Sequence, residues 1–238
     1  MIFASDNWSG ASERIVAAVA EAARNGGPAY GGDALTSAAE AQFGAVFERE
    51  VAVFFVATGT AANALGVSAF SRPGGIVFCH RLAHLHTEEA GATELFSGGM
   101  KTIGLEGPGG KLTPDGLAAA IERFPQGSTH HGQPVAVSLS NLTEIGTAYG
   151  PNEVAAIAEA AKRRRLIVHM DGARIANAIA GLGCSPADLT WRAGVDVLSF
   201  GGTKNGCIAA DAVVFFDRAA ARDFAFARQR AGHTFSKG

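Results

Sequence analysis

The chain has 238 residues and a formal net charge of −2, with 47% hydrophobic and 18% charged residues. This composition excludes a disordered chain, and the near-neutral charge excludes a broad basic surface for nucleic acid. The three cysteines form no Cys-x-x-Cys pair, which argues against a disulfide framework or a structural zinc site. The apolar runs are too short to span a membrane and the first residues lack the basic region of a signal peptide, so we expect a cytoplasmic protein.

Helix and strand patterns alternate along the chain. Ser12 and Thr36 are predicted to cap two helices that end near residues 24 and 47, and the apolar run 51–57 predicts a strand buried on both faces. A helix over 61–70 and a strand over 76–80 follow. Further helices are predicted at 113–124 and 151–165, and further strands at 135–140, 166–170, 195–200 and 212–216. This alternation predicts an α/β fold of three layers, α/β/α, with a mostly parallel sheet.

The segments that leave the predicted strands are all polar or rich in glycine. In sheets of this kind, ligands bind beyond the carboxyl ends of the strands. We therefore expect a ligand site built from these segments, which are 58–60, 80–86, 141–144, 171–174 and 201–206.

Lys204 lies among three glycines, directly after a predicted buried strand. Glycines let the backbone approach a ligand closely, and a lysine partly removed from water is suited to Schiff-base chemistry. A surface turn that carries a solvated lysine is the alternative interpretation of the same residues.

Two further strand ends carry groups that bind parts of a cofactor. Asp171 can keep a heterocyclic nitrogen protonated, and Arg174 can bind a carboxylate with two hydrogen bonds. The alternative is an Asp–Arg pair that only closes a turn. The turn Thr58–Thr60 precedes a predicted helix, whose free N–H groups suit a phosphate, although phosphate-free turns look similar.

A pair of histidines is also compatible with a metal site. His84 and His86 form a His-x-His pair, with two glutamates close behind. A metal leaves Lys204 and the Thr58–Thr60 turn unexplained, so we predict no metal and keep a metal-dependent hydrolase as an alternative.

A phosphate turn, an acid for a ring nitrogen and a lysine after a later strand together predict a pyridoxal phosphate site. The sequence also resembles the family of low-specificity L-threonine aldolases, with phenylserine aldolase, whose fold is that of the aspartate aminotransferases. The resemblance is most specific from His169 to Gly206. The other matching segments are 5–7, 30–31, 57–65, 83–92, 133–134, 143–147 and 182–186.

The resemblance implies how the cofactor, pyridoxal 5′-phosphate, is held. Lys204 would form the Schiff base, and Asp171 would pair with the pyridine nitrogen. Gly59 and Thr60 would hold the phosphate. His84 would stack on the ring and is the candidate for proton transfer at the substrate hydroxyl.

The resemblance also implies the residues that bind the amino acid substrate. Arg174 would bind its carboxylate beside the cofactor, together with Ser5. Tyr30 would line the site. Asn141 falls at a position near the substrate hydroxyl where relatives usually carry a different polar residue.

The implied activity is cleavage of the Cα–Cβ bond of L-threonine, L-allo-threonine and related β-hydroxy-α-amino acids into glycine and an aldehyde. The resemblance further implies a homodimer or homotetramer. It implies an N-terminal arm over residues 1–30, a cofactor-binding large domain over 31–238, and a small C-terminal domain that these residues do not include. The alternatives are a truncated, non-catalytic remnant that binds the cofactor or oligomerises, and a related pyridoxal phosphate lyase or aminotransferase.

Overall fold

One seven-stranded sheet forms the centre of the structure, a computed structural model that describes residues 4–237. The strand order is β1-β7-β6-β5-β4-β2-β3, and β7 runs antiparallel to both of its neighbours while all other neighbours are parallel. The predicted mostly parallel α/β sheet is therefore confirmed. The strands are β1 (Ala52–Val56), β2 (Gly75–His80), β3 (Lys101–Leu105), β4 (Gln133–Ser140), β5 (Ile167–Gly172), β6 (Val197–Gly201) and β7 (Asp211–Phe215).

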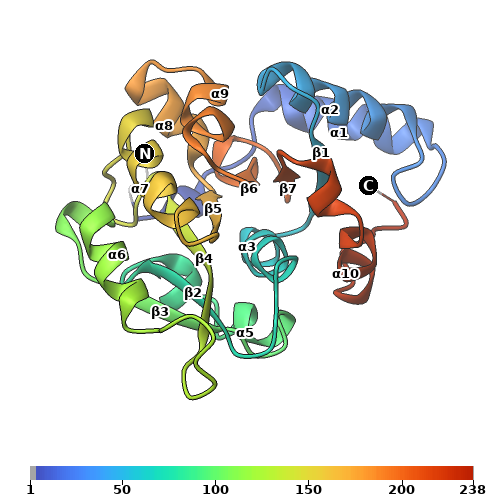
Figure 1. Cartoon of the computed structure of the whole chain (residues 1–238). Helices are drawn as coiled ribbons and strands as arrows, with labels where there is room; N and C mark the ends of the chain where they lie inside the picture. Colours follow the sequence, from blue (N-terminus) through green and yellow to red (C-terminus); the bar gives the residue numbers. More distant parts are fainter. Residues whose placement is uncertain (1–3, 238) are drawn as a thin grey trace.

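Helices cover both faces of this sheet and complete the predicted three layers (Figure 1). Helices α6 and α7 pack together on one face, and α3 packs on β6 and β7 from the other. The helices are α1 (Glu13–Asn25), α2 (Ala34–Val46), α3 (Gly59–Ser68), α4 (His84–Thr87), α5 (Ala92–Phe96), α6 (Pro114–Glu122), α7 (Pro151–Lys162), α8 (Ile175–Leu182), α9 (Pro186–Leu189) and α10 (Phe224–Arg230). Short 3-10 turns include η1 (Asp6–Trp8) and η4 (Thr203–Asn205).

The central strands are apolar throughout because helices cover them on both sides. In β7, Val213 and Phe215 belong to the core cluster that includes Leu65 of α3, whereas Val214 belongs to the cluster that includes Ile157 of α7. Successive side chains of a strand point to opposite faces, so one strand contributes to both cores.

Two details differ from the sequence predictions. Helix α2 begins at Ala34, with Asp33 as its cap, because the Asp33 carboxylate accepts hydrogen bonds from the backbone N–H of Thr36 at 2.8 Å and from its hydroxyl at 2.7 Å. The prediction of Thr36 as the cap was therefore wrong. Strand β1 was predicted to be buried on both faces, but it lies at an edge of the sheet and only Val53 and Val56 are buried.

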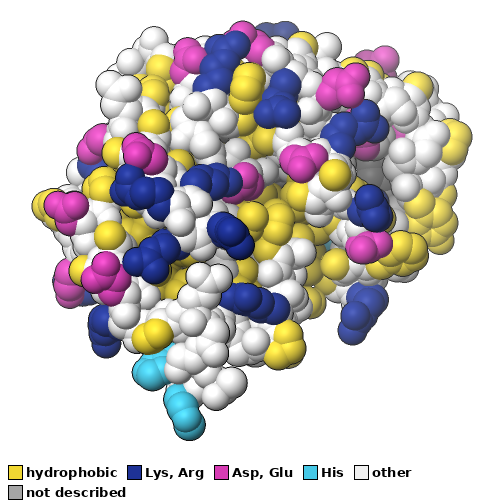
Figure 2. All heavy atoms as spheres, viewed as in Figure 1, with side chains coloured by type: hydrophobic (Ala, Val, Ile, Leu, Met, Phe, Trp, Pro, Cys, Tyr) yellow, Lys and Arg dark blue, Asp and Glu magenta, His cyan; other side chains and the backbone are white. Residues whose placement is uncertain are grey.

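The surface mixes charges of both signs. Figure 2 shows Lys and Arg side chains interspersed with Asp and Glu side chains over one face, in agreement with the net charge of −2. Among residues 4–237, no helix combines the length and the apolar character that crossing a membrane requires.

Candidate active site

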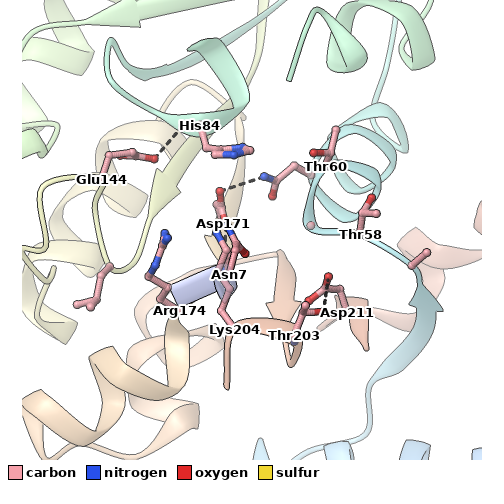
Figure 3. Close-up of a pocket in the computed structure, with 15 residues that line it drawn as sticks. Asn7, Thr58, Thr60, His84, Glu144, Asp171, Arg174, Thr203, Lys204 and Asp211 are labelled. Carbon is pink, nitrogen blue, oxygen red and sulfur yellow. Dashed lines mark hydrogen bonds between the residues drawn. The ribbon is translucent and has the colours of Figure 1, made fainter. Parts of the chain in front are cut away.

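A cavity of about 260 Å³ lies at the carboxyl ends of the parallel strands, and all five segments that were predicted to form a site line it (Figure 3). The segments after β1, β4 and β5 contribute to it together with α4 and η4. The lining residues are Asn7, Ala57, Thr58, Gly59, Thr60, Asn63, His84, Leu142, Glu144, Asp171, Ala173, Arg174, Thr203, Lys204 and Asp211.

Lys204 lies in η4, immediately after β6, and lines the cavity. The preceding glycines allow a close approach of backbone to backbone: a Cβ at Gly201 would overlap the carbonyl of Ala173, and one at Gly202 would overlap the carbonyl of Ala210. These two glycines pack the lysine-bearing turn against the segment after β5 and the residue before β7, and the close approach of backbone to a ligand stays a prediction.

The amino end of α3 forms another wall of the cavity. The Thr58 hydroxyl accepts a hydrogen bond from the N–H of Ala61 at 3.1 Å and so caps the helix, which begins at Gly59. The first N–H groups of a helix have no partner within the helix, and the helix dipole adds partial positive charge there. Gly59 and Thr60 thus lie where an anionic group would be stabilised.

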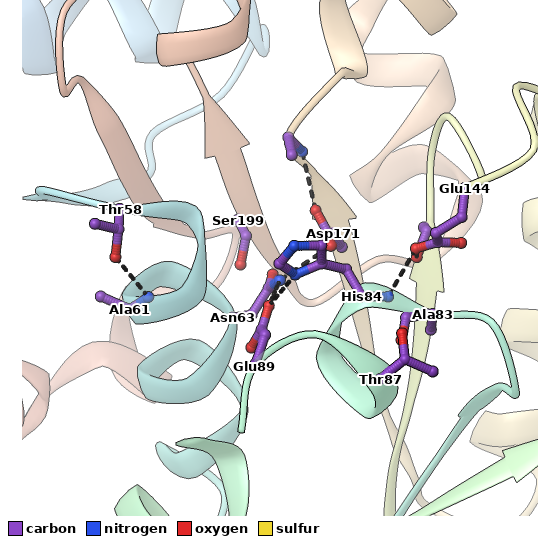
Figure 4. A network of polar contacts seen from close by, with 12 residues as sticks. Thr58, Ala61, Asn63, Ala83, His84, Thr87, Glu89, Glu144, Asp171 and Ser199 are labelled. Atoms are coloured by element: carbon purple, nitrogen blue, oxygen red, sulfur yellow. Dashed lines mark hydrogen bonds and ion pairs between the residues drawn. The ribbon is translucent and has the colours of Figure 1, made fainter. Parts of the chain in front are cut away.

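Asp171 lies at the end of β5, and its carboxylate is held in a fixed orientation. One oxygen accepts the N–H of Ala173 at 3.0 Å, and the other accepts Asn63 Nδ2 at 3.0 Å (Figure 4). Beneath it, His169 is fully buried between the hydroxyls of Ser138 at 2.8 Å and Ser199 at 2.9 Å. Burial lowers the pKa of His169 to about 4, so this imidazole is neutral at neutral pH.

His84 extends from α4 to the cavity, and acidic groups hold it at two points. Its backbone N–H donates to Glu144 at 2.8 Å, and its Nδ1 lies 2.9 Å from Oε1 of the buried Glu89 (Figure 4). The hydrogen bond with Glu89 raises the pKa of His84, while partial burial lowers it. His86 does not share this position, because its Nδ1 contacts the hydroxyl of Thr102.

Arg174 follows β5 and lines the cavity with its guanidinium already engaged. Its Nε and Nη2 donate to the two carboxylate oxygens of Asp6, at 2.5 and 3.0 Å. This bidentate pair lowers the pKa of Asp6 and fastens η1 to the edge of the site. The Nη1 end of the guanidinium has hydrogens that remain available to a ligand.

Six of the nine residues predicted for the site line this one cavity, and three do not. Ser5 caps η1 by accepting the N–H of Asn7 at 3.2 Å, and Tyr30 is 64% exposed in the loop before α2. Asn141 is completely buried, and its side-chain amide makes hydrogen bonds to both the carbonyl and the N–H of Tyr149. Asn141 therefore holds a loop together and does not line the cavity.

Several residues that shape the site carry no motif that predicts a role for them. Asp211 lies at the start of the antiparallel strand β7, where it accepts hydrogen bonds from the hydroxyl and N–H of Thr203 beside Lys204. Asn63 lies inside α3, between buried apolar residues, and binds Asp171 and Glu89. At both positions the signal in the sequence was a polar residue next to a run of apolar residues.

No group of three or more metal-binding side chains occurs among residues 4–237. His84 and His86, the pair that suggested a metal, have different partners in the structure.

The sheet and the cavity at the carboxyl ends of its strands are typical of one class of protein. Comparison with known proteins identifies that class. The model of the family described as beta-eliminating lyase matches residues 3–238, and the chain belongs to this family.

Within this family, the chain is similar to threonine aldolases. It is 46% identical over 236 residues to the low specificity L-threonine aldolase of Pseudomonas aeruginosa, and 44% identical to that of another Pseudomonas strain. Each match covers 99% of this chain and 67% of the relative, so the chain spans about two thirds of their length. The structure of Leishmania major threonine aldolase matches 98% of this chain and 68% of its own, with a TM-score of 0.91 and 28% identity.

Proposed function

We propose that the chain is a pyridoxal phosphate-dependent aldolase that cleaves L-threonine, L-allo-threonine and related β-hydroxy-α-amino acids to glycine and an aldehyde. The observation that carries the proposal is the meeting of Lys204, Asp171 and the amino end of α3 around one cavity. The identity of 46% to a low specificity L-threonine aldolase supports the choice of reaction.

The residues around the cavity fit pyridoxal phosphate by their chemistry. Lys204 offers the amine that holds the cofactor aldehyde. The Asp171 carboxylate, fixed by Asn63 and Ala173, offers a negative charge to the protonated ring nitrogen. Gly59 and Thr60 at the amino end of α3 offer N–H groups and a hydroxyl to the phosphate.

Different residues of this chain bind the substrate and accept its proton. When bound, pyridoxal phosphate supplies an electron-withdrawing ring that stabilises the negative charge left on the substrate Cα. Arg174 binds the substrate carboxylate and orients the amino acid. His84 takes the proton of the β-hydroxyl at Nε2, the Cα–Cβ bond breaks, the aldehyde leaves, and glycine remains once Cα is reprotonated.

The test replaces the proposed cofactor lysine and a matched lysine outside the site. Lys204→Ala should abolish the visible absorption of lysine-bound pyridoxal phosphate and the release of glycine and acetaldehyde from threonine. Lys111→Ala is the control, because Lys111 pairs with Glu153 and does not line the cavity. An unchanged visible spectrum in Lys204→Ala refutes the cofactor assignment, and transamination without aldehyde release refutes the aldolase assignment.

We further propose how the residues of this chain divide into an arm and a domain. Residues 1–30 act as an arm on a cofactor domain over 31–238, which is supported by the contacts of Asp6 with Arg174 and of the Ser12 N–H with the Gly206 carbonyl at 3.0 Å. We also propose that the chain forms a homodimer or homotetramer and is located in the cytoplasm. Light scattering gives the molar mass of the oligomer.

A further inference from the structure

A buried chain of hydrogen bonds connects His84 with Asp171 behind the cavity (Figure 4). The side chain of Glu89 is fully buried, and its Oε1 accepts from both His84 Nδ1 at 2.9 Å and Asn63 Nδ2 at 2.8 Å. The same Asn63 nitrogen also donates to Asp171 at 3.0 Å. Neither Glu89 nor Asn63 lies in a sequence motif that predicts a role in catalysis.

The chemistry of an amide explains why asparagine occupies this position. The Asn63 nitrogen carries two hydrogens and divides them between the carboxylates of Glu89 and Asp171. Turning the amide around would place its oxygen against both carboxylates and leave two buried acceptors facing a third. The orientation of Asn63 is thereby fixed, and with it the separation of the two acids.

The contact with Glu89 likewise fixes which nitrogen of His84 faces the site. Burial raises the pKa of Glu89, whereas the hydrogen bonds from His84 and Asn63 lower it. The ionised carboxylate only accepts hydrogen bonds, so with Glu89 ionised His84 Nδ1 carries the proton of this pair. The lone pair of the neutral ring then lies on Nε2, the nitrogen that remains for a ligand in the cavity.

We infer that Glu89 and Asn63 are positioning residues of this site: Glu89 holds His84 with Nδ1 protonated and Nε2 free, and Asn63 ties Glu89 to Asp171. The proton acceptor and the ring-nitrogen acid are thus held by one buried network. The inference rests on the proposed function for its catalytic meaning, whereas the network itself is a property of the protein without cofactor.

Two features make this network energetically important. Glu89 Oε2 and Asn63 Oδ1 are buried and have no hydrogen-bond partner within residues 4–237, so both residues depend on the bonds of Glu89 Oε1 and Asn63 Nδ2, and the loss of one of these would leave a further buried polar atom unpaired. Charged groups also surround the imidazole: Glu89 and Asp171 favour protonation of His84, and Lys204 opposes it.

The experiment compares Glu89→Gln with Glu88→Gln, its exposed neighbour in sequence. Imidazole nitrogen NMR of the cofactor-free protein reports the tautomer and pKa of His84, whose signals are assigned by their loss in His84→Asn. In Glu89→Gln we expect the pKa of His84 to fall by about one unit and the Nδ1-protonated form to lose its dominance. Glu88→Gln should match the wild type.

Conservative variants separate positioning from a general loss of structure. Glu89→Asp keeps the charge and should restore part of the shift in the pKa of His84, and Asn63→Ser, which keeps one donor hydrogen, should give an intermediate value. If Glu89→Gln fails to fold, these two variants decide on the same readout. A His84 pKa and tautomer that stay at wild-type values in the folded variants overturn the inference.

Kinetics of the loaded enzyme provide a separate measurement. Glu89→Gln should lower kcat for threonine cleavage by about 10- to 100-fold and move the acid limb of its pH profile together with the NMR pKa, at little change in KM. A protein without aldolase activity that keeps the NMR response refutes the proposed function and leaves the network intact. An NMR response with an unmoved pH profile refutes the catalytic meaning of the network.

Discussion

Asp6→Asn tests how the N-terminal segment is fastened to the site. The side chains of Asp6 and Arg174 are 32% and 31% exposed, and they form a bidentate pair. An exposed ion pair contributes less than about 1 kcal/mol, whereas removing one partner of a buried pair costs about 3–5 kcal/mol, so Asp6→Asn in this part-exposed pair should cost about 1 kcal/mol. That loss raises the fraction of molecules with a detached arm about fivefold, because 1.4 kcal/mol corresponds to tenfold.

Amide hydrogen exchange measures this detachment directly. The N–H of Ser12 bonds to the carbonyl of Gly206 across the junction, so its exchange should accelerate about fivefold in Asp6→Asn. Asp188→Asn is the control, since Asp188 pairs with Arg192 at 3.0 Å away from the arm. Equal exchange at Ser12 in the wild type and Asp6→Asn, or an equal acceleration in the control, would refute the reasoning.

The same pair predicts a pH dependence with a definite sign. Arg174 lowers the pKa of Asp6 below 3.8, so the contribution of the pair is fully present above that value and is lost as the pH falls through the lower folded value. The difference between the wild type and Asp6→Asn should therefore shrink only in strong acid.

Three further predictions concern the site and its support. Asp171→Asn should keep the bound cofactor but cut turnover of threonine at least about tenfold, because the ring nitrogen loses the charge that keeps it protonated; wild-type rates would mean that Asp171 only closes a turn. Thr58→Ala should lower the free energy of unfolding by about 1 kcal/mol in urea, because α3 loses its cap, and an unchanged midpoint would contradict the role of this hydroxyl. The free energy of unfolding of the wild type should fall by up to about 1.4 kcal/mol per pH unit as the pH falls from 6.5 to about 4, because the unfolded chain binds a proton at His169 that burial excludes. His169→Asn should flatten this slope. An equal slope in both proteins would refute the lowered pKa of His169.

The sequence predicted the long, regular elements because their patterns are local. Thr113 caps α6 with Pro114 at its first position, as its residue types indicate, and the apolar run near β7 becomes a buried strand. The short helices α4, α5 and α8 had no such signal, since a helix of four to eight residues depends more on its packing than on its own pattern.

The edge of the sheet that carries the site was also predictable, from one rule of α/β folds. Segments that leave parallel strands meet at one edge, and the structure places all five around the cavity. Asp211 escaped this rule because β7 is antiparallel, so its amino end, paired with Gly201 of β6, lies at the edge where the other strands end. Strand direction depends on contacts that are distant in sequence, and no local pattern encodes it.

Glu89 and Asn63 illustrate what sequence reasoning lacks at the scale of single side chains. In the sequence, Glu88 and Glu89 are two adjacent and equivalent acids. The structure buries Glu89 and exposes Glu88. A buried carboxylate is costly unless it is hydrogen-bonded, and the bonds that His84 and Asn63 donate to Glu89 offset part of this cost. His84 belongs to α4 and Asn63 to α3, two helices that contact each other only in the folded structure. The cost of burying one acid therefore determines the orientation of the histidine, and this link between stability and chemistry arises only once the chain is folded.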